Sequence, residues 1–462
     1  MRKQLKIGTF LQRISPMNKN KYPRVLIIGE QFDHLTGGGI TLSNLFADWP
    51  RECLAFAHHR TPTPETRKGA SSFYLLGREE IIIPWPMSKY SKLSASGPVH
   101  CDSAFCSENI AAQPTTSRKR GLLWKILVKS VQQLGLQEFL TRQSPSPLFL
   151  SWVRAFSPDL VYVQLGSLGS IQFNNTLAEK LGLSFVVHIM DDWPVYMYAR
   201  CLAGPLLRPI MSREFDKFLR YSVIRLGICQ AMCDEYEKRF GGKWLSFHNP
   251  VDLNKWQVIS RKKWKSDTIP FRILYSGRIG RGISQSIVDI AKVVSGLAKD
   301  GMDIEFLIRT ADLAADVTAV LRGMNAVRVE SFLPFNKVPE SLAKADLLVI
   351  PYDFDPYSVL CSKYSMPTKT AEYMVCGTPT LVYAPNDFAI SHYARSEGWG
   401  YTVTANTSDK LREAIKSLAT DEGLREQLGR RAMELAARNH DALLIRENFN
   451  QVLKCDDTSL KN

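Results

Sequence analysis

The same sequence pattern, a short apolar run followed by glycines and then by a helical stretch, occurs at two distant places in this chain. Residues 24–29 (RVLIIG) lead into the glycines at 37–39, and residues 271–275 (FRILY) lead into a glycine-containing turn at 276–282. Apolar runs of this length are typical of parallel strands that are buried on both faces. Parallel strands need helical crossovers, so the repeated pattern predicts an α/β fold with two Rossmann-like domains.

The domain boundaries follow from where this pattern is interrupted. We expect an N-terminal domain at 21–255, a linker at 256–269 around the polar stretch RKKWK, and a C-terminal domain at 270–430. Residues 431–462 should form a helix and tail that pack back across both domains. Further strands are predicted at 160–163, 184–189, 304–308, 327–330, 347–351 and 380–383.

Three N-terminal segments do not fit the strand and helix alternation. Residues 1–20 carry five Lys and Arg and read as a basic arm, and residues 59–120, rich in Pro, Ser and Thr, read as an irregular insertion. Residues 122–140 have the pattern of an amphipathic helix beside a basic cluster, which would suit a membrane surface. A helix that covers the sheet of its own domain explains the same pattern and is the favoured alternative.

Positive charge is concentrated in the first half of the chain. The net charge is +14, and residues 1–250 hold 31 Lys and Arg against 19 Asp and Glu, while residues 251–462 hold 28 against 26. A basic domain attracts nucleic acid or an anionic membrane. Because no zinc-finger spacing or aromatic RNA-binding motif is present, we expect no nucleic acid and an anionic membrane surface as the partner.

The spacing of the cysteines and the hydropathy of the chain indicate an intracellular location. Nine cysteines are scattered without a Cys-x-x-Cys pair, which argues against disulfides and structural zinc. No run of 18 apolar residues occurs, and the N-terminus has no apolar signal core. We therefore expect a cytoplasmic protein that is at most peripheral to the inner face of the membrane.

Glycines and arginines at the two strand-to-helix turns suit the binding of phosphates. Gly37, Gly38 and Gly39 form the first turn, where backbone N–H groups can approach an anion. Arg278 and Arg281 flank the second turn and could bind a diphosphate by charge-assisted hydrogen bonds. The first turn matches neither a dinucleotide nor a Walker motif, and it could also be a simple flexible turn.

Residues 367–377 predict a short helix that begins near a proline and ends at a glycine. Lys369 and Glu372 are three residues apart and share a face of this helix. A cation and a carboxylate beside free helical N–H groups suit a ligand with phosphates and vicinal hydroxyls. A surface ion pair is the equally weighted alternative.

Acidic residues follow the strand predicted at 184–189. Asp191 and Asp192 would lie at the carboxyl end of the sheet, where open α/β folds bind ligands, and His188 precedes them within the strand. Asp353 and Asp355 form an Asp-x-Asp pair, but no third ligand accompanies them, so we assign no metal.

These motifs together resemble the GT-B glycosyltransferases, and most closely the retaining family 4 group. Glu372, Met374, Gly377 and Pro379 match the family motif Glu-x-Met-x-x-Gly-x-Pro, and residues 249–252 (NPVD) resemble its Asn-Gly-Val-Asp. The resemblance implies two Rossmann-like domains that face each other across a cleft. It also implies a ribose-binding role for Glu372 and donor-diphosphate contacts for Arg278 and Arg281, with Gly37–Gly39 near the donor phosphates and the acceptor. The charge of Lys369 could neutralise the same diphosphate.

Two positions depart from the family pattern. Tyr364 stands where the family has a second glutamate, which touches the donor sugar, and Asp191-Asp192 stand where many members have His-Asp. Asp191, Asp192 and His188 are therefore the candidates for orienting the acceptor or the donor sugar, and none is singled out as a base.

The function expected from this resemblance is transfer of a sugar from a nucleoside diphosphate sugar to a hydroxyl acceptor, with retention of configuration. No metal and no cofactor beyond the donor would be needed. The acceptor would be a glycan, a lipid-linked molecule or a surface polysaccharide precursor that docks on the basic N-terminal domain. The alternatives are a non-catalytic scaffold in a glycan-assembly complex and a nucleotide-sugar epimerase or inverting transferase.

Overall fold

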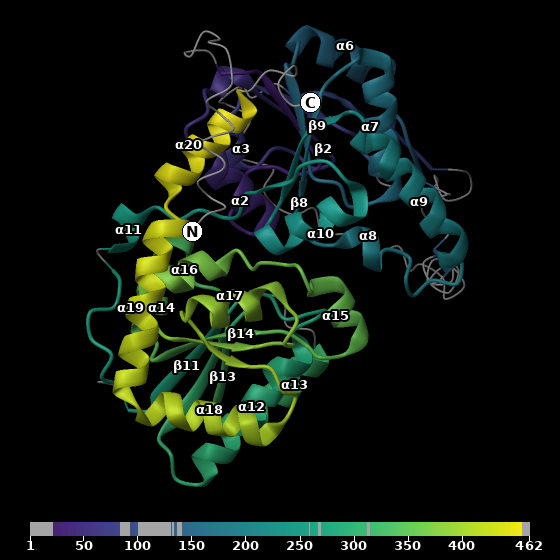
Figure 1. The fold of residues 1–462 in the computed structure, drawn as a ribbon. Helices are drawn as coiled ribbons and strands as arrows, with labels where there is room; N and C mark the ends of the chain where they lie inside the picture. Colours follow the sequence, from purple (N-terminus) through teal and green to yellow (C-terminus); the bar gives the residue numbers. More distant parts are fainter. Residues whose placement is uncertain are drawn as a thin grey trace.

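The computed structural model describes residues 22–83, 93–99, 131, 134–135, 141–257, 259–266, 269–311 and 315–454. The predicted basic arm at 1–20 lies outside the described residues. The same holds for most of the helix predicted at 122–140 and for large parts of the insertion predicted at 59–120. Where the structure describes this insertion, the prediction of an irregular segment was wrong, because Pro64–Gly69 is a helix and Ser72–Leu75 is a strand of the N-terminal sheet. Within the described ranges the chain forms two α/β domains, one above the other (Figure 1).

The N-terminal domain is built on an eight-stranded sheet in the order β10-β9-β8-β7-β1-β2-β3-β5. Its neighbouring strands are parallel except for β3 and β5. The strands are β1 Val25–Ile28, β2 Leu54–His58, β3 Ser72–Leu75, β5 Gly97–Pro98, β7 Leu160–Val163, β8 Phe185–Ile189, β9 Ser222–Gly227 and β10 Leu245–Ser246, and a separate pair joins β4 Ile81–Ile82 to β6 Arg142–Gln143.

Helices cover both faces of this sheet, which explains why strands such as β1 are buried along their whole length. One buried cluster joins the sheet to α6, α7, α9 and α10, and the other joins it to α2 and α20. The helices of this half of the chain are α2 Gly37–Leu45, α3 Pro64–Gly69, α6 Pro147–Phe156, α7 Leu168–Leu181, α8 Trp193–Tyr196, α9 Gly204–Leu219, α10 Gln230–Phe240 and α11 Leu253–Gln257, with a 3-10 turn at Arg51–Cys53.

The C-terminal domain repeats the architecture with a six-stranded, wholly parallel sheet in the order β13-β12-β11-β14-β15-β16. Its strands are β11 Phe271–Ser276, β12 Ile304–Arg309, β13 Val327–Glu330, β14 Leu347–Pro351, β15 Thr380–Tyr383 and β16 Tyr401–Val403. Its helices are α12 Ser284–Lys299, α13 Ala315–Arg322, α14 Val338–Lys344, α15 Pro356–Ser362, α16 Lys369–Cys376, α17 Ala389–Glu397, α18 Ser408–Thr420 and α19 Glu422–Asn439, with a 3-10 turn at Phe335–Lys337.

Both sheets have a point at which the strand order reverses. β1 lies between β2 and β7, and β11 lies between β12 and β14. Open parallel sheets bind ligands at the carboxyl ends of the strands beside such a point. The two glycine turns predicted from the sequence follow β1 and β11, so the topology places both at this favoured position.

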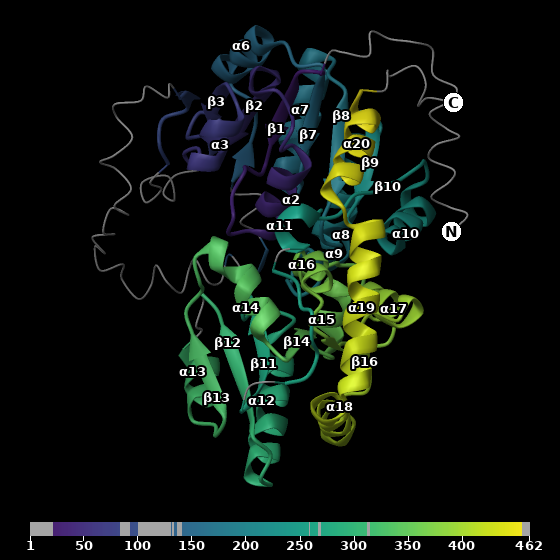
Figure 2. The same ribbon diagram turned by 90° about the vertical axis from the view of Figure 1, so that its left-hand side faces the viewer.

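The end of the chain returns to the N-terminal domain, as predicted. Helix α19 packs against α16, and α20 (Ala442–Leu453) then crosses to the first domain (Figure 2). Phe449 of α20 is fully buried in the N-terminal core, and Arg446 Nε donates to Asn44 O at 2.6 Å. At the crossing, His440 Nδ1 lies 2.5 Å from His248 Nε2. The last helix therefore ties the domains together.

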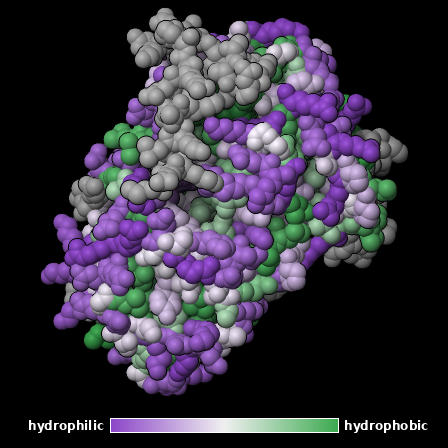
Figure 3. Space-filling view, viewed as in Figure 1, coloured by the Kyte–Doolittle hydropathy of each residue, from purple (hydrophilic) through white to green (hydrophobic). Residues whose placement is uncertain are grey.

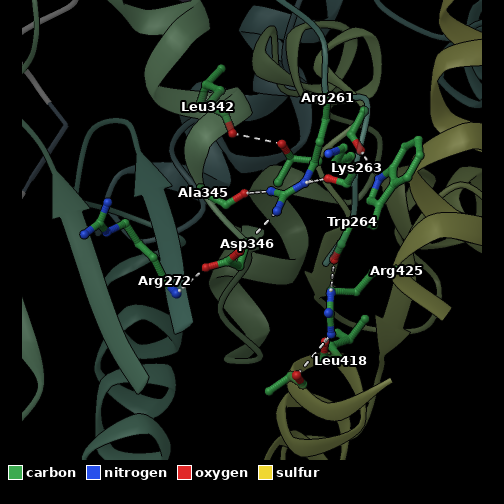
Figure 4. A network of polar contacts seen from close by, with 12 residues as sticks. Arg261, Lys263, Trp264, Arg272, Leu342, Ala345, Asp346, Leu418 and Arg425 are labelled. Atoms are coloured by element: carbon green, nitrogen blue, oxygen red, sulfur yellow. Dashed lines mark hydrogen bonds and ion pairs between the residues drawn. The ribbon is translucent and has the colours of Figure 1, made fainter. Parts of the chain in front are cut away.

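The segment predicted as a polar linker is anchored to the C-terminal domain (Figure 4). Arg261 Nη2 lies 3.1 Å from Asp346 Oδ1, and Asp346 also accepts a hydrogen bond from Arg272 N at 2.8 Å. The indole Nε1 of Trp264 donates to Gly377 O at 2.8 Å, and Arg425 Nε donates to Trp264 O at 3.0 Å. Residues 261–264 are thus fixed against the second domain.

The strands predicted at 160–163, 327–330, 347–351 and 380–383 have the bounds that the structure shows. The prediction of a glycine loop at Gly37–Gly39 was wrong, because these glycines form the first turn of α2. Thr36 is the N-cap, and its side chain accepts a hydrogen bond from Gly39 N at 2.9 Å. Among the described residues, no helix is long and apolar enough to cross a bilayer.

Candidate active site

The carboxyl ends of β1 and β11 and the start of α16 meet at the junction of the two domains. Arg278 Nη2 donates to Leu35 O of the first domain at 3.5 Å. A Cβ atom placed on Gly37 would lie 3.4 Å from Thr368 Cγ2, one residue before α16. The first glycine turn, the second glycine turn and the short helix, which are far apart in the sequence, are therefore brought together.

Lys369 points back to the end of β11. Its Nζ donates to Ser276 O at 2.9 Å and lies 4.3 Å from the centre of the Tyr275 ring. The absence of a side chain at Gly277 makes room for this ammonium, because a Cβ there would clash with Lys369 Nζ. Burial lowers the pKa of Lys369 to about 8, and the Glu372 carboxylate acts in the opposite direction.

Glu372 follows Lys369 by three residues on α16, whose C-terminus is closed by Gly377 in the left-handed conformation (φ 72°). Burial raises the pKa of Glu372 to about 7, against the effect of Lys369. Both residues are half-buried at the domain junction, and their partial removal from water is the main cause of both pKa shifts. The pair is poised to change charge near neutral pH.

The two arginines of the second turn have different neighbours. Arg278 reaches the first domain at Leu35, next to the predicted phosphate site. Arg281 Nη1 lies 3.4 Å from the hydroxyl of Tyr357 on α15, and its guanidinium is 5.5 Å from the centre of that ring. Arg278 and Lys369 thus flank Gly277, whereas Arg281 lies beside α15.

The start of α2 lies close to two polar side chains of the first domain. A Cβ on Gly38 would lie 2.7 Å from Glu30 Oε2 and 2.8 Å from Gln164 Oε1, and one on Gly39 would clash with Asp33 at 2.5 Å. Burial raises the pKa of Glu30. Glycine is required here by this close approach, and Glu30 is a polar group of the site that the sequence analysis did not identify.

His188 lies in the core of the N-terminal domain and not at the junction. Its ring is 1% exposed, Nδ1 is 2.6 Å from the hydroxyl of Tyr162, and Nε2 is 3.0 Å from Phe247 O. Burial lowers the pKa of His188 to about 3. The structure does not bring His188 together with the other candidates, since strand alternation turns its side chain into the sheet's covered face.

Asp192 is likewise held inside the first domain. It is 2% exposed, forms an ion pair with Arg239 at 2.9 Å, and accepts a hydrogen bond from the Tyr236 hydroxyl at 2.8 Å. These contacts attach the turn after β8 to α10. The structure thus places the Asp192 carboxylate within the first domain, paired with Arg239.

Asp191 is the one member of the predicted trio that reaches the second domain. Its Oδ1 accepts a hydrogen bond from Ser365 Oγ at 2.8 Å, and desolvation by the surrounding protein raises the pKa of its carboxyl, although part of the residue stays exposed. Next to this serine, Tyr364 packs on the N-terminal core, where its carbonyl accepts a hydrogen bond from Cys229 Sγ. The residue that replaces the family's second glutamate therefore serves the contact between the domains.

The Asp-x-Asp pair in the second domain caps helices. Asp353 Oδ1 accepts a hydrogen bond from Ser286 N at 2.8 Å in the first turn of α12, and Asp355 is the N-cap of α15. Among the described residues, no three His, Cys, Asp or Glu side chains are grouped as a metal site would require.

Comparison with known proteins agrees with this geometry. Residues 270–421 match the sequence model of the family described as glycosyl transferases group 1. The crystal structure of Anabaena HepE in complex with UDP-glucose has a TM-score of 0.58 to this chain, covering 94% of it and 99% of HepE at 12% identity.

Two further crystal structures have the same arrangement of domains. Sucrose-phosphate synthase from Thermosynechococcus elongatus has a TM-score of 0.57 and covers 93% of this chain and 97% of its own at 14% identity. α,α-Trehalose 6-phosphate synthase from Burkholderia multivorans has a TM-score of 0.55 and covers 94% and 98% at 10% identity. The chain has the GT-B fold.

At such low identity the likeness to these structures concerns the fold alone, while the family match concerns the C-terminal domain that carries Arg278, Lys369 and Glu372. No curated protein shows significant sequence similarity to the chain. Together, the family match and the GT-B neighbours support a glycosyltransferase.

Arg200 and Tyr357 are junction residues that the sequence analysis missed. The Arg200 guanidinium lies 3.7 Å from the centre of the Tyr357 ring, and its Nη2 is 3.7 Å from Asp355 Oδ1. His34 also stacks on Phe335 across the junction, with ring centres 4.6 Å apart. No local motif marks these residues, because each pair joins segments that only the packing of the GT-B domains brings together.

Proposed function

We propose that this GT-B protein transfers a sugar from a nucleoside diphosphate sugar to a hydroxyl acceptor, with retention of configuration. The acceptor in this proposal is a glycan or a lipid-linked precursor of a cell-surface polysaccharide. It is bound by the basic N-terminal domain at the inner face of the membrane. The reaction needs neither a metal ion nor a cofactor other than the donor.

The placement of Lys369 carries this proposal. Its ammonium is held at the carboxyl end of β11 beside Gly277, with Arg278 next in the chain and Glu372 one helical turn further on. Cations beside a glycine turn suit a diphosphate. A carboxylate one helical turn further on suits the vicinal hydroxyls of a ribose. A scaffold without a donor would have no use for a buried lysine and glutamate at this place.

In the proposed mechanism, the main task of the protein is to stabilise the leaving diphosphate. Negative charge develops on the diphosphate oxygens as the bond to the sugar breaks, and Lys369 and Arg278 neutralise it without a metal ion. The acceptor attacks on the face that the leaving group departs from, and the leaving phosphate takes the acceptor proton. Asp191, which reaches across the junction to Ser365, orients the sugar or the acceptor.

A thermal-shift experiment tests the donor site. UDP, GDP, ADP and CDP and their common sugars are compared, beginning with UDP-glucose because the HepE crystal structure of the same fold contains it. Ligand at about a hundredfold excess over its Kd should add about 2.7 kcal/mol of stability. Glu372→Ala and Arg278→Ala should remove the shift.

Arg430→Ala is the matched control, because Arg430 forms an exposed ion pair with Glu426 on α19 and should leave the shift intact. If no nucleotide stabilises the wild-type protein, or if both site variants keep the full shift, the donor-site assignment fails. The anomeric configuration of the product, measured by NMR, then distinguishes retention from inversion.

A further inference from the structure

The corner between α8 and α9 exposes an unusual pair of leucines. Leu202 is 80% exposed and Leu206 is 72% exposed, and they lie within one turn of each other at the start of α9. Pro205 between them is also exposed. Apolar residues interrupt the hydrophilic surface on the side of the molecule where α9 lies (Figure 3). We call residues 200–213 the α9 corner.

Residues 200–213 carry only positive charge, and carboxylates lie close by at Asp355 of the second domain, 3.7 Å from Arg200, and at the exposed Asp216, three residues after Arg213. The α9 corner itself contains Arg200, Arg208 and Arg213 and no Asp or Glu. Arg208 and Arg213 are exposed, and within the described part of the chain neither has an ion-pair partner. The next acidic residue, Glu214, accepts a hydrogen bond from Asn175 at 2.8 Å and is thereby turned toward α7. Exposed leucines among unpaired arginines are complementary to an anionic lipid surface.

A second exposed leucine pair shows that leucine exposure alone does not create this surface. Leu443 is 64% exposed and Leu444 is 51% exposed on α20. They lie between Asp441 and Glu447, so the local charge around them is mixed. The combination of apolar and basic residues is therefore a property of the α9 corner.

The α9 corner is continuous with the junction of the domains. Arg200, at its first position, stacks on Tyr357 and lies 3.7 Å from Asp355 of the second domain. In Figure 1, α8 lies directly above α15, and these two helices are in contact. A groove of about 480 Å³ beside the corner is lined by side chains that include Pro205, Arg208 and Phe215. A surface bound to this corner would lie at the edge of the candidate active site.

We propose that the α9 corner docks the protein on anionic phospholipid bilayers. Leu202 and Leu206 enter the boundary between head groups and acyl chains, and Arg208 and Arg213 contact lipid phosphates. This inference deepens the proposed function, because a protein held in this way would receive a lipid-linked acceptor at the domain junction. Docking itself requires neither donor nor acceptor.

Co-sedimentation of the full chain with vesicles tests the proposal. Vesicles with about 30% phosphatidylglycerol in phosphatidylcholine are compared with pure phosphatidylcholine, at about 0.1 M salt. The wild type should bind the anionic vesicles and not the neutral ones. Leu202→Ser with Leu206→Ser should weaken binding at least about tenfold, and Arg208→Gln or Arg213→Gln about fivefold each, with a shallower dependence on salt.

Leu443→Ser with Leu444→Ser is the matched control and should bind as the wild type does. All variants change exposed side chains, and an unchanged thermal midpoint without ligand confirms that they fold. The proposal would be overturned if the wild type did not bind anionic vesicles. It would also be overturned if substitution of the two leucine pairs weakened vesicle binding equally. The proposal would also fail if sedimentation velocity showed a dimer of the wild type and a monomer of the variant with Leu202→Ser and Leu206→Ser.

The two proposals fail separately. The donor-induced thermal shift is measured on the same variants without vesicles. If vesicle binding is absent but the donor still raises the thermal midpoint, only the docking proposal fails. If vesicles bind but no donor raises the thermal midpoint, only the donor-site proposal fails.

Discussion

The affinity for the intact donor should depend on pH through Glu372. In the ligand-free protein, burial raises the pKa of this carboxyl to about 7. An ionised carboxylate accepts hydrogen bonds from two ribose hydroxyls, whereas the protonated form gives up part of this capacity. A proton on Glu372 therefore competes with the donor. The affinity for the donor is high when the pH is above the pKa of Glu372 and falls as the pH drops below it.

The size of the effect follows from the pKa. With a value near 7, the carboxyl is about nine-tenths ionised at pH 8 and about one-tenth ionised at pH 6, so the titration of Glu372 taken alone raises Kd roughly tenfold, or by about 1.4 kcal/mol. Because Lys369 is about half uncharged at pH 8, the net rise in Kd from pH 8 to pH 6 is about fivefold. Lys369, whose pKa is lowered to about 8, loses its charge on the alkaline side. The affinity should therefore be highest between about pH 7 and pH 8.

Isothermal titration calorimetry with an intact nucleoside diphosphate sugar measures this dependence, since the diphosphate of such a donor does not titrate in this range. Glu372→Gln should bind more weakly and lose the acidic limb of the profile, while the alkaline limb due to Lys369 remains. Glu426→Gln, at an exposed ion pair, should keep the wild-type profile. A wild-type Kd that is constant from pH 6 to pH 8, or a rise in Kd toward pH 6 that survives in Glu372→Gln, would refute the reasoning.

Three substitutions test other parts of the structure. Gly277→Ala should weaken donor binding about tenfold in calorimetry, because the new Cβ displaces the ammonium of Lys369. It should also cost about 1–3 kcal/mol in urea unfolding, because that Cβ would lie 2.8 Å from the hydroxyl of the fully buried Tyr275. Arg261→Ala should cost about 3 kcal/mol in the same unfolding measurement, because Asp346, which is 2% exposed, loses its cation. Phe449→Ala should cost about 3–5 kcal/mol, because this ring is fully buried where α20 meets the first domain.

Exposed residues serve as controls for these three changes. Lys410→Ala removes an exposed ion pair with Glu413 on α18 and should change the free energy of unfolding by less than about 0.5 kcal/mol. Leu443→Ala, on the exposed side of α20, should have a similarly small effect. If Arg261→Ala is no more costly than Lys410→Ala, the anchoring of residues 261–264 does not stabilise the fold. A small cost for Phe449→Ala would mean that α20 detaches easily.

Local physical chemistry explains which elements the sequence predicts well. The strands at 160–163 and 347–351 are short apolar runs bounded by turn residues, and a buried parallel strand needs nothing more to be recognised. Helix α16 was predicted because its proline, its terminal glycine and the three-residue spacing of Lys369 and Glu372 act within a few residues of one another. The α/β class and the two domains could be inferred in this way.

The first glycine turn shows where this local reasoning stops. Three successive glycines have no intrinsic preference for a helix, so a loop was expected at 37–39. The helix begins there because Thr36 caps it and Asp33 holds Thr36, with Asp33 Oδ1 accepting hydrogen bonds from the backbone N–H groups of Leu35 and Thr36. These hydrogen bonds of Asp33 and Thr36 outweigh the low helix propensity of the three glycines.

The sequence alone determined the strands with continuous apolar runs, such as β7 and β14, the ends of the short helix and the residue types at the donor site, since each depends on neighbours in the chain. Strands β2, β3, β9 and β16 were recognised only in the folded sheets. The tertiary structure alone decided the direction of side chains: Asp191 reaches Ser365 of the other domain while the adjacent Asp192 is tied to Arg239, and His188 is enclosed in the core. It alone also joined Arg200 to Tyr357. The Asp191–Ser365 and Arg200–Tyr357 pairs each span more than a hundred residues in the chain, and they form only when the two domains pack together, which no local pattern records.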